Sequence, residues 1–245
     1  MKTRYPALAA GLLALCARAA LAGPADYVHV PTVEYGEREI ELKAGRASYG
    51  DASHAQAAKI GFGVGAQPWW FTEVYVGFEG ASGESTKYEA LEWENVFQLT
   101  ERGKYPFEAG VLLEIERPRD HAEGWELRYG PLLQTELGRV QLNGNLLFES
   151  HAHAESPGET ELSYEWQAKY RWRPAFEFGA QGFGGMGPWD HWDPAGEQAH
   201  ELGPAVFGRL HLAGRQALRY DAAYLVGTSA GAPDRTLRVR LEYEF

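Results

Sequence analysis

The chain ends with the stretch LRVRLEYEF, residues 237–245, in which apolar and charged residues alternate without a break. Leu237, Val239, Leu241, Tyr243 and Phe245 share one side of an extended backbone, and the arginines and glutamates between them share the other. Successive side chains of a β-strand point to opposite faces, so this stretch predicts a strand with one apolar and one fully charged face.

The same two-residue period recurs along the chain after residue 36, where no window keeps a helical apolar stripe over three turns. Twelve segments show it, most of them nine residues or longer: 38–46, 58–64, 70–79, 91–99, 107–116, 125–137, 140–149, 161–172, 176–184, 201–212, 218–226 and 237–245. Strands of soluble proteins are usually about 5–6 residues long, whereas a tilted strand that crosses a bilayer needs ~9–11. We therefore predict an all-β chain that forms an antiparallel up-and-down transmembrane β-barrel over residues 37–245.

The connections between these segments alternate in length. Tight turns at 67–68, 138–139, 173–175 and 214–216 alternate with longer polar stretches, the longest of which is 187–198. Outward aromatic residues gather at the strand ends on the side of the tight turns: Trp70, Phe107, Trp172, Phe176, Tyr220, Tyr243 and Phe245. Short periplasmic turns, longer outer loops and aromatic girdles are typical of bacterial outer-membrane barrels, so we expect both ends of the barrel sequence on the periplasmic side.

The composition excludes several other classes of protein. A mean hydropathy of −0.40 argues against a bundle of membrane helices but not against alternating strands. The 245 residues carry a net charge of −11, which argues against nucleic acid as a partner. A hydrophobic fraction of 44% is too high for a disordered chain.

Residues 1–22 have the features of a cleavable signal peptide. Lys2 and Arg4 precede the apolar run 7–15, and Ala20-Leu21-Ala22 supplies an A-x-A cleavage pattern. A lipoprotein signal at Cys16 is the less favoured alternative, because Leu15 stands where a small residue is normally needed. Cleavage removes three basic and no acidic residues, so the mature chain has a net charge of −14 and no cysteine. We expect residues 23–36 to form a short periplasmic segment ahead of the barrel.

On these features the chain resembles the bacterial outer-membrane β-barrel proteins, without matching a particular subfamily. Its last strand is similar to the C-terminal signal that such proteins present to the barrel assembly machinery, carried here by Leu237, Val239, Leu241, Tyr243 and Phe245. The resemblance implies export to the outer membrane of a Gram-negative bacterium. It also implies contact with membrane lipid, lipopolysaccharide and the assembly machinery.

If the apolar face meets lipid, the polar face lines the interior, and its charges are unevenly distributed. An acidic wall is expected from Glu73, Glu92, Glu94, Glu108, Glu114, Glu116, Glu126 and Glu136. A basic wall is expected from Lys169, Arg171, Arg209, Arg219, Arg238 and Arg240. Such walls could pair and block the lumen, or could orient dipolar solutes in an open one. The interior of an eight-stranded barrel is filled by side chains, and a 16-stranded barrel contains a channel. A count of twelve strands therefore does not show whether the lumen is open or blocked.

Our first hypothesis is a porin-like transport barrel that passes or binds small polar solutes, with no cofactor and no enzymatic activity. The alternative is a plugged structural or surface-interaction barrel. A lipid hydrolase is less favoured, because Ser150 and His151 are adjacent in a strand and should point to opposite faces. His151 and His153 share one side of an extended chain and form a weak candidate for a metal site.

Overall fold

The computed structural model describes residues 23–156 and 158–245. The predicted signal peptide, residues 1–22, lies outside the described residues. The strands are β1 (Arg38–Ser48), β2 (His54–Gln67), β3 (Trp70–Ala81), β4 (Lys87–Gln98), β5 (Phe107–Pro118), β6 (Trp125–Leu137), β7 (Val140–Ala152), β8 (Glu161–Arg173), β9 (Phe176–Pro188), β10 (Ala199–His211), β11 (Ala217–Gly227) and β12 (Arg235–Glu244). A single 3₁₀ turn, η1 (His121–Glu123), interrupts the loops of the described chain. No helix among the described residues is long and apolar enough to span a membrane.

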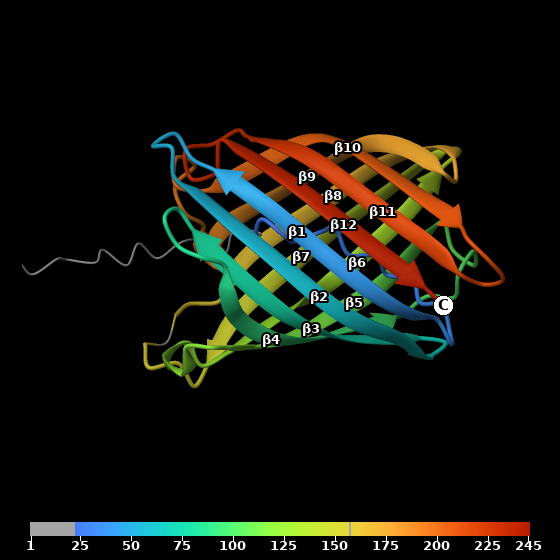
Figure 1. Cartoon of the computed structure of the whole chain (residues 1–245), viewed down its shortest axis with the longest axis horizontal. Helices are drawn as coiled ribbons and strands as arrows, with labels where there is room; N and C mark the ends of the chain where they lie inside the picture. The colour runs from blue at the N-terminus through green and yellow to red at the C-terminus, as the bar shows by residue number, and fades with distance from the viewer. Residues whose placement is uncertain (1–22, 157) are drawn as a thin grey trace, which may run out of the picture.

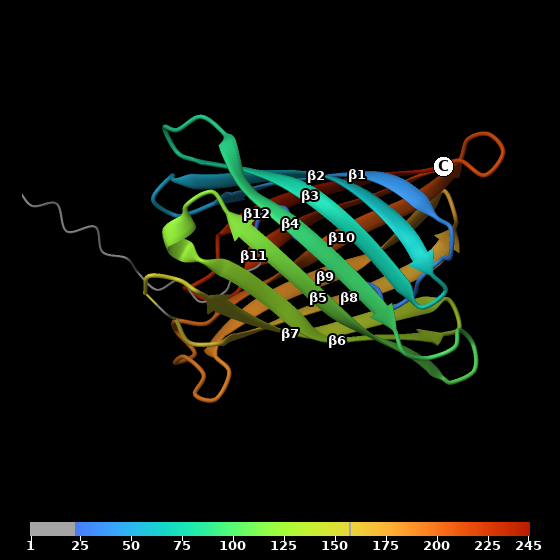
Figure 2. The ribbon, with the colours of Figure 1, turned by 90° about the horizontal axis from the view of Figure 1, so that it is seen from below.

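The strands form one closed antiparallel sheet (Figures 1 and 2). Each strand pairs with its neighbours in sequence, and the sheet closes where β1 pairs with β12, from Glu39 opposite Glu244 to Ser48 opposite Arg235. Closure leaves no exposed strand edge, which is the arrangement that satisfies every backbone group in lipid. The predicted twelve-stranded up-and-down barrel is confirmed.

The two ends of the barrel differ in their connections. At the end where β1 begins and β12 ends, three connections contain only two residues, 68–69, 138–139 and 174–175. We call this the turn end. At the opposite end, the loop end, every connection has five residues or more, and 189–198 is the longest.

The alternation read from the sequence sorts side chains to the two faces of the sheet. Ile40 and Leu42 on β1 are 45% and 44% exposed on the outer face, whereas Glu39, Glu41 and Lys43 between them are 4% exposed or less. The charged face therefore points into the barrel, and an apolar belt surrounds it.

Aromatic pairs lie on both ends of this belt. At the turn end, Trp172 packs against Phe176 and Tyr243 against Phe245, with ring centroids 6.1 and 5.8 Å apart. At the loop end, Phe78 packs against Tyr88 at 6.5 Å. The sequence-based prediction located the girdle at the turn end alone, and the structure adds the second one.

Residues 23–37 do not join the sheet but run through the inside of the barrel, where Figure 1 shows them in dark blue. We call them the lumen segment. Its start lies against the loop-end half of β1, where a Cβ on Gly45 would be 1.6 Å from the carbonyl oxygen of Pro24. Its end lies at the turn end, where the Gly36 amide donates to the Gly65 carbonyl at 2.9 Å. The sequence predicts a short periplasmic segment ahead of the barrel for residues 23–36, whereas the structure gives most of them partners on the inner faces of the strands.

Candidate functional site: a segment held inside the lumen

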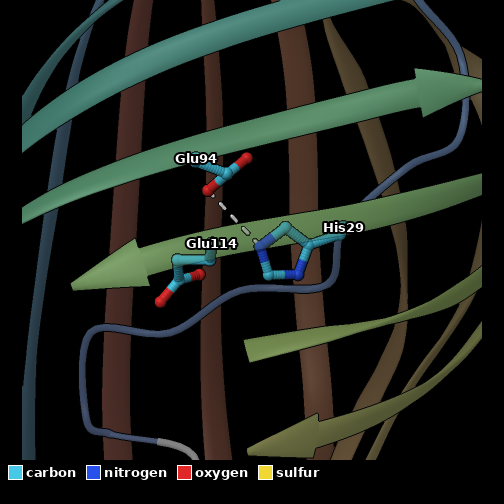
Figure 3. A group of neighbouring side chains, drawn as sticks. All are labelled: His29, Glu94 and Glu114. Atoms are coloured by element: carbon cyan, nitrogen blue, oxygen red, sulfur yellow. Dashed lines mark ion pairs between the residues drawn. The ribbon is translucent and has the colours of Figure 1, made fainter. Parts of the chain in front are cut away.

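His29 lies near the centre of the barrel and contacts two distant strands. Its side chain is 3% exposed, with Nδ1 3.0 Å from Oε2 of Glu165 on β8 and Nε2 3.5 Å from Oε2 of Glu94 on β4 (Figure 3). The His29 amide also donates to Glu165, and the side-chain amide of Asn145 donates to the His29 carbonyl at 3.0 Å. One residue of the lumen segment therefore links β4, β7 and β8.

Tyr27 adds a second contact through its ring and its hydroxyl. The hydroxyl donates to Glu94 at 3.0 Å. Two cations contact the ring: Nζ of Lys43 lies 3.8 Å from its centroid, and the guanidinium of Arg240 lies 4.2 Å from it. Lys43 also lies 3.7 Å over the ring of Tyr75 on β3. These cation–π contacts hold two wall cations against the segment.

Ion pairs fix the start of the lumen segment. Asp26 lies 3.3 Å from Arg128, which also pairs with Glu165 at 2.9 Å. On the other side, Arg238 donates to the Gly23 carbonyl at 3.2 Å and pairs with Glu201 at 2.7 Å. The backbone carbonyls and the side chains of the segment thus share the charged groups that line the wall.

Two valines of the segment each enter an apolar cluster on the otherwise polar inner face. Val28 packs with Phe183, Ala205, Phe207, Ala223 and Leu225 on β9–β11. Val33 packs with Val96, Leu112, Leu132 and Leu147 on β4–β7, together with Phe71. These wall residues occupy inward positions that would face water in an empty barrel, so the lumen segment covers them.

The eight predicted acidic-wall residues lie on β3–β6 and face inward, with Glu73, Glu92, Glu94 and Glu114 at most 4% exposed. Several have a partner on a neighbouring strand. Glu92 contacts Lys59, Glu116 is 3.9 Å from Lys59, Glu108 accepts from Gln134 at 2.6 Å, and Glu126 is 3.7 Å from His151. The partners of the acidic wall therefore come from β1, β2, β6, β7, β8 and the lumen segment.

The six predicted basic-wall residues lie on β8–β12 and pair mainly with acids that the sequence-based assignment omitted. Lys169 pairs with Glu177, Arg209 with Glu244, Arg219 with Glu242 and Glu244, Arg238 with Glu201, and Arg240 with Glu41 and Glu242. Among the described residues, the one ion pair between the two predicted walls joins Arg171 to Glu136, at 2.8 Å. The lumen segment lies between the walls elsewhere.

A cavity of about 980 Å³ opens beside the lumen segment towards the turn end. Its lining includes charged groups of both signs: Arg102, Lys169, Arg171, Arg173, Arg209, Arg219 and Arg240, with Glu34, Glu108, Glu136, Glu177, Asp221 and Glu242. Glu34 of the segment lies 3.6 Å from Arg102 in the β4–β5 connection. The lumen is therefore narrowed by the segment but not filled at this end.

The structure separates the residues of the weak metal-site candidate, His151 and His153, and those of the hydrolase candidate, Ser150 and His151. His151 faces inward beside Glu126 and Glu149, whereas His153 begins the β7–β8 connection with φ 60° and does not belong to that group. Ser150 points the other way, with its hydroxyl 2.8 Å from the hydroxyl of Thr160.

Sequence reasoning missed the residues that matter most for this arrangement, Tyr27, Val28, His29 and Val33. Their partners are distant in the chain, 136 positions away for His29 and Glu165, so no local period marks them. One signal was available: Leu112, Leu132 and Leu147 are apolar residues at inward positions of otherwise polar faces.

Comparison with known proteins identifies the fold. No protein-family model matches this chain, and no curated protein matches it either. An outer membrane channel from Pseudomonas putida F1 superposes with a TM-score of 0.59 at 10% identity, over 90% of this chain and 99% of that one. The translocator domain of the autotransporter NalP from Neisseria meningitidis gives 0.48 at 9% identity, over 86% of this chain and 88% of that one. The chain thus has the fold of a twelve-stranded closed β-barrel, and its structural neighbours are barrels of the bacterial outer membrane.

Proposed function

We propose that this protein is an outer-membrane channel for small polar solutes and that the lumen segment closes it at rest. The apolar belt would then contact lipid and the outer leaflet's lipopolysaccharide, and β12 would carry the signal read by the barrel assembly machinery. The Pseudomonas putida protein that shares the fold is itself described as an outer membrane channel.

The observation that carries the proposal is the way in which the lumen segment is held. The central part of the segment, from Tyr27 to Val33, contacts the wall through side chains: Glu165 and Gln98 accept its amides, and Asn145 donates to its carbonyl. Within residues 23–156 and 158–245, no strand pairs with this central part, and the sheet closes between β1 and β12 without it. Release of the segment would therefore leave the hydrogen-bonded ladder of the barrel intact while opening the lumen.

The charges around the turn-end cavity indicate the class of solute. Basic and acidic groups line it in nearly equal number, and most of the basic ones lie on β8–β12. A field across the lumen would orient a dipolar or zwitterionic solute, since each end of such a molecule is attracted to the wall of opposite sign. We propose small solutes that carry both signs of charge as the cargo.

Planar-bilayer conductance of the purified protein tests this proposal. We expect few openings of the native barrel and a large, steady conductance for a variant that lacks residues 23–36. A deletion variant that still shows folded-barrel mobility on a gel but conducts no ions would overturn the proposal.

A cross-linked variant avoids the risk that the deletion impairs folding. A Cβ on Gly110 of β5 would lie 3.0 Å from the Cβ of Pro31. The Cβ atoms of a disulfide are about 3.5–4.5 Å apart, so a small outward shift of the lumen segment brings the two positions into bridging range. Because the predicted mature chain has no cysteine of its own, Pro31→Cys combined with Gly110→Cys gives one defined bridge. We expect the oxidised form to stay closed and the reduced form to open as the native protein does. Equal conductance in both forms would show that the segment does not control the pore.

A permanently plugged structural barrel is the second candidate, and the dense ion pairing around His29 favours it. It predicts that neither deletion nor reduction of the bridge changes the conductance. We propose no catalytic role for Ser150 and His151, and the lipid hydrolysis of a Ser150→Ala variant measured against the native protein checks this.

A further inference from the structure

One ring nitrogen of His29 is buried and has no hydrogen-bond partner. Nε2 lies in the interior of the barrel, in a side chain that is 3% exposed, and the nearest carboxylate oxygen, Oε2 of Glu94, is 3.5 Å away. Figure 3 shows this nitrogen directed to a space between Glu94 on β4 and Glu114 on β5. A buried nitrogen in this position is costly unless a proton or a cation joins it to the carboxylates.

Glu114 is the second group without a partner. Its side chain is buried, with the residue 4% exposed, yet no hydrogen bond or ion pair to it occurs within the described residues. Its carboxylate oxygen, Nε2 of His29 and an oxygen of Glu94 all lie within 4.8 Å of one another. Ligands at about 2.0–2.2 Å from one metal ion are at most about 4.4 Å apart, so a small side-chain adjustment would bring all three onto one ion.

The other ring nitrogen, Nδ1 of His29, contacts a carboxylate in the way that is usual for metal-binding histidines. Metal-ligating histidines usually donate their other N–H to a carboxylate, which fixes the ring and raises the basicity of the ligating nitrogen. Nδ1 of His29 lies 3.0 Å from Glu165, and Glu165 is itself fixed by Arg128 at 2.9 Å and by the side-chain amide of Asn145 at 3.0 Å. The ring therefore has its tautomer and direction set, with Nε2 left to bind.

We propose that His29, Glu94 and Glu114 form a binding site for a divalent transition metal of the zinc class, with Glu165 orienting His29. One imidazole and two carboxylates are donors that such ions accept, and they leave a coordination position for water. The ion would join the lumen segment to β4 and β5 at once, because its ligands come from all three.

Neighbouring side chains compete with a metal ion for the carboxylate of Glu94 but not for that of Glu114. Lys43 lies 3.8 Å from Glu94, and the Tyr27 hydroxyl donates to the same carboxylate. Lys59 and Arg128 face Glu92 and Glu165, so neither of them neutralises Glu114 by an ion pair. A divalent ion would place two positive charges where a proton on His29 places one, beside a Glu114 carboxylate that has no direct ion pair among the described residues.

Other groups of acidic and histidine side chains in the described chain lack this combination. Glu126, Glu149 and His151 lie within the same distance of one another, but all three are partly exposed, whereas His29, Glu94 and Glu114 are buried. That group is the natural internal comparison for the test.

Zinc titration by calorimetry on the full-length mature protein in detergent, stripped with a chelator beforehand, tests the proposal. Cobalt absorption in the visible range gives a second readout of a nitrogen-containing site. We expect one tight equivalent in the native protein, weakened at least tenfold in Glu114→Gln. Glu114→Gln is the preferred variant because Glu114 makes no hydrogen bond whose loss could impair folding. We expect Glu165→Gln to weaken binding about 10–100-fold, the range for groups that orient a ligand.

The controls separate this site from its neighbours. His29→Gln should abolish the cobalt band, whereas His153→Gln and Glu126→Gln should leave both readouts unchanged. Absence of zinc binding in the native protein would overturn the proposal, and so would binding that survives Glu114→Gln and His29→Gln but is lost in Glu126→Gln. Neither readout depends on ion conduction, so the outcome is independent of the proposed channel function.

Discussion

Gly45 shows how a single inner-face residue makes room for the lumen segment. Its missing side chain lets the Pro24 carbonyl approach the backbone of β1, and any Cβ there would collide with that oxygen. Gly65 serves the same purpose at the turn end, where a Cβ would lie 1.9 Å from the Glu34 carbonyl. Since neither glycine has a positive φ, close approach of the segment rather than backbone freedom explains them.

Gly45→Ala should therefore displace the start of the lumen segment without opening the sheet. Overpacking of this kind costs about 1–3 kcal/mol, and here the cost falls on the seating of the segment. We expect faster proteolysis within residues 23–37 and a higher conductance than in the native protein. Gly144→Ala is the matched control, because a Cβ on this strand glycine meets nothing within 4 Å. Equal proteolysis in both variants would contradict the assignment.

His191, in the exposed β9–β10 loop, forms a charged contact between two loops. The ring N–H at Nδ1 of His191 donates to the Asp190 carboxylate at 2.8 Å, and Glu159 in the β7–β8 connection lies 3.3 Å from Nε2. Both contacts raise the pKa of His191 above its usual 6.5. A raised pKa means that the contact is complete below pH 6.5 and is lost as the pH rises through the pKa of the folded state. An NMR titration of His191 should give a midpoint above 6.5, and Glu159→Gln should lower it. An unchanged midpoint in that variant would exclude the inter-loop contact.

At the scale of the elements, the strands were predictable and the lumen segment was not. Residues 237–245 predict β12 because side chains two positions apart lie on the same face of a strand. The alternation is therefore visible in a short stretch of sequence. The lumen segment has no such rule, since Tyr27 and His29 are fixed by Glu94 and Glu165, which are far away in sequence. The predicted walls are inner-face residues in the structure, but their pairing depends on the register between strands, which alternation alone does not supply.

The final strand makes a prediction of its own. β12 ends beside the start of β1, with the Phe245 amide donating to the Arg38 carbonyl at 2.9 Å and the Phe245 ring stacked on Tyr243. We expect Phe245→Ala to reduce the amount of folded protein in the outer membrane several-fold and to leave the conductance of the assembled fraction unchanged. Quantitative blotting of membrane fractions measures the first effect, with Leu212→Ala, an exposed apolar residue in the β10–β11 connection, as the control. Normal assembly of Phe245→Ala would remove the proposed role of β12 as an assembly signal.

The whole molecule is a sheet without edges, and this property predicts its behaviour on a gel. Every strand is hydrogen-bonded on both sides, so detergent alone should not unfold the barrel, whereas boiling should. We expect unboiled and boiled samples to migrate differently in the presence of SDS. Identical mobility would count against a closed barrel, and the same gel verifies the folding of each variant described above.

The course of the lumen segment has a consequence for the order of assembly. A space enclosed by the first and last strands does not exist until the last ten residues of the chain have been synthesised and paired. Residues 23–37 leave the ribosome before any strand, yet reach their final surroundings after all of them. In one route, the segment lies against the open sheet and is enclosed when β1 pairs with β12. In the other, the segment is threaded end-on into the closed barrel. A large folded domain fused ahead of Gly23 distinguishes these histories, since enclosure tolerates such a fusion and threading does not.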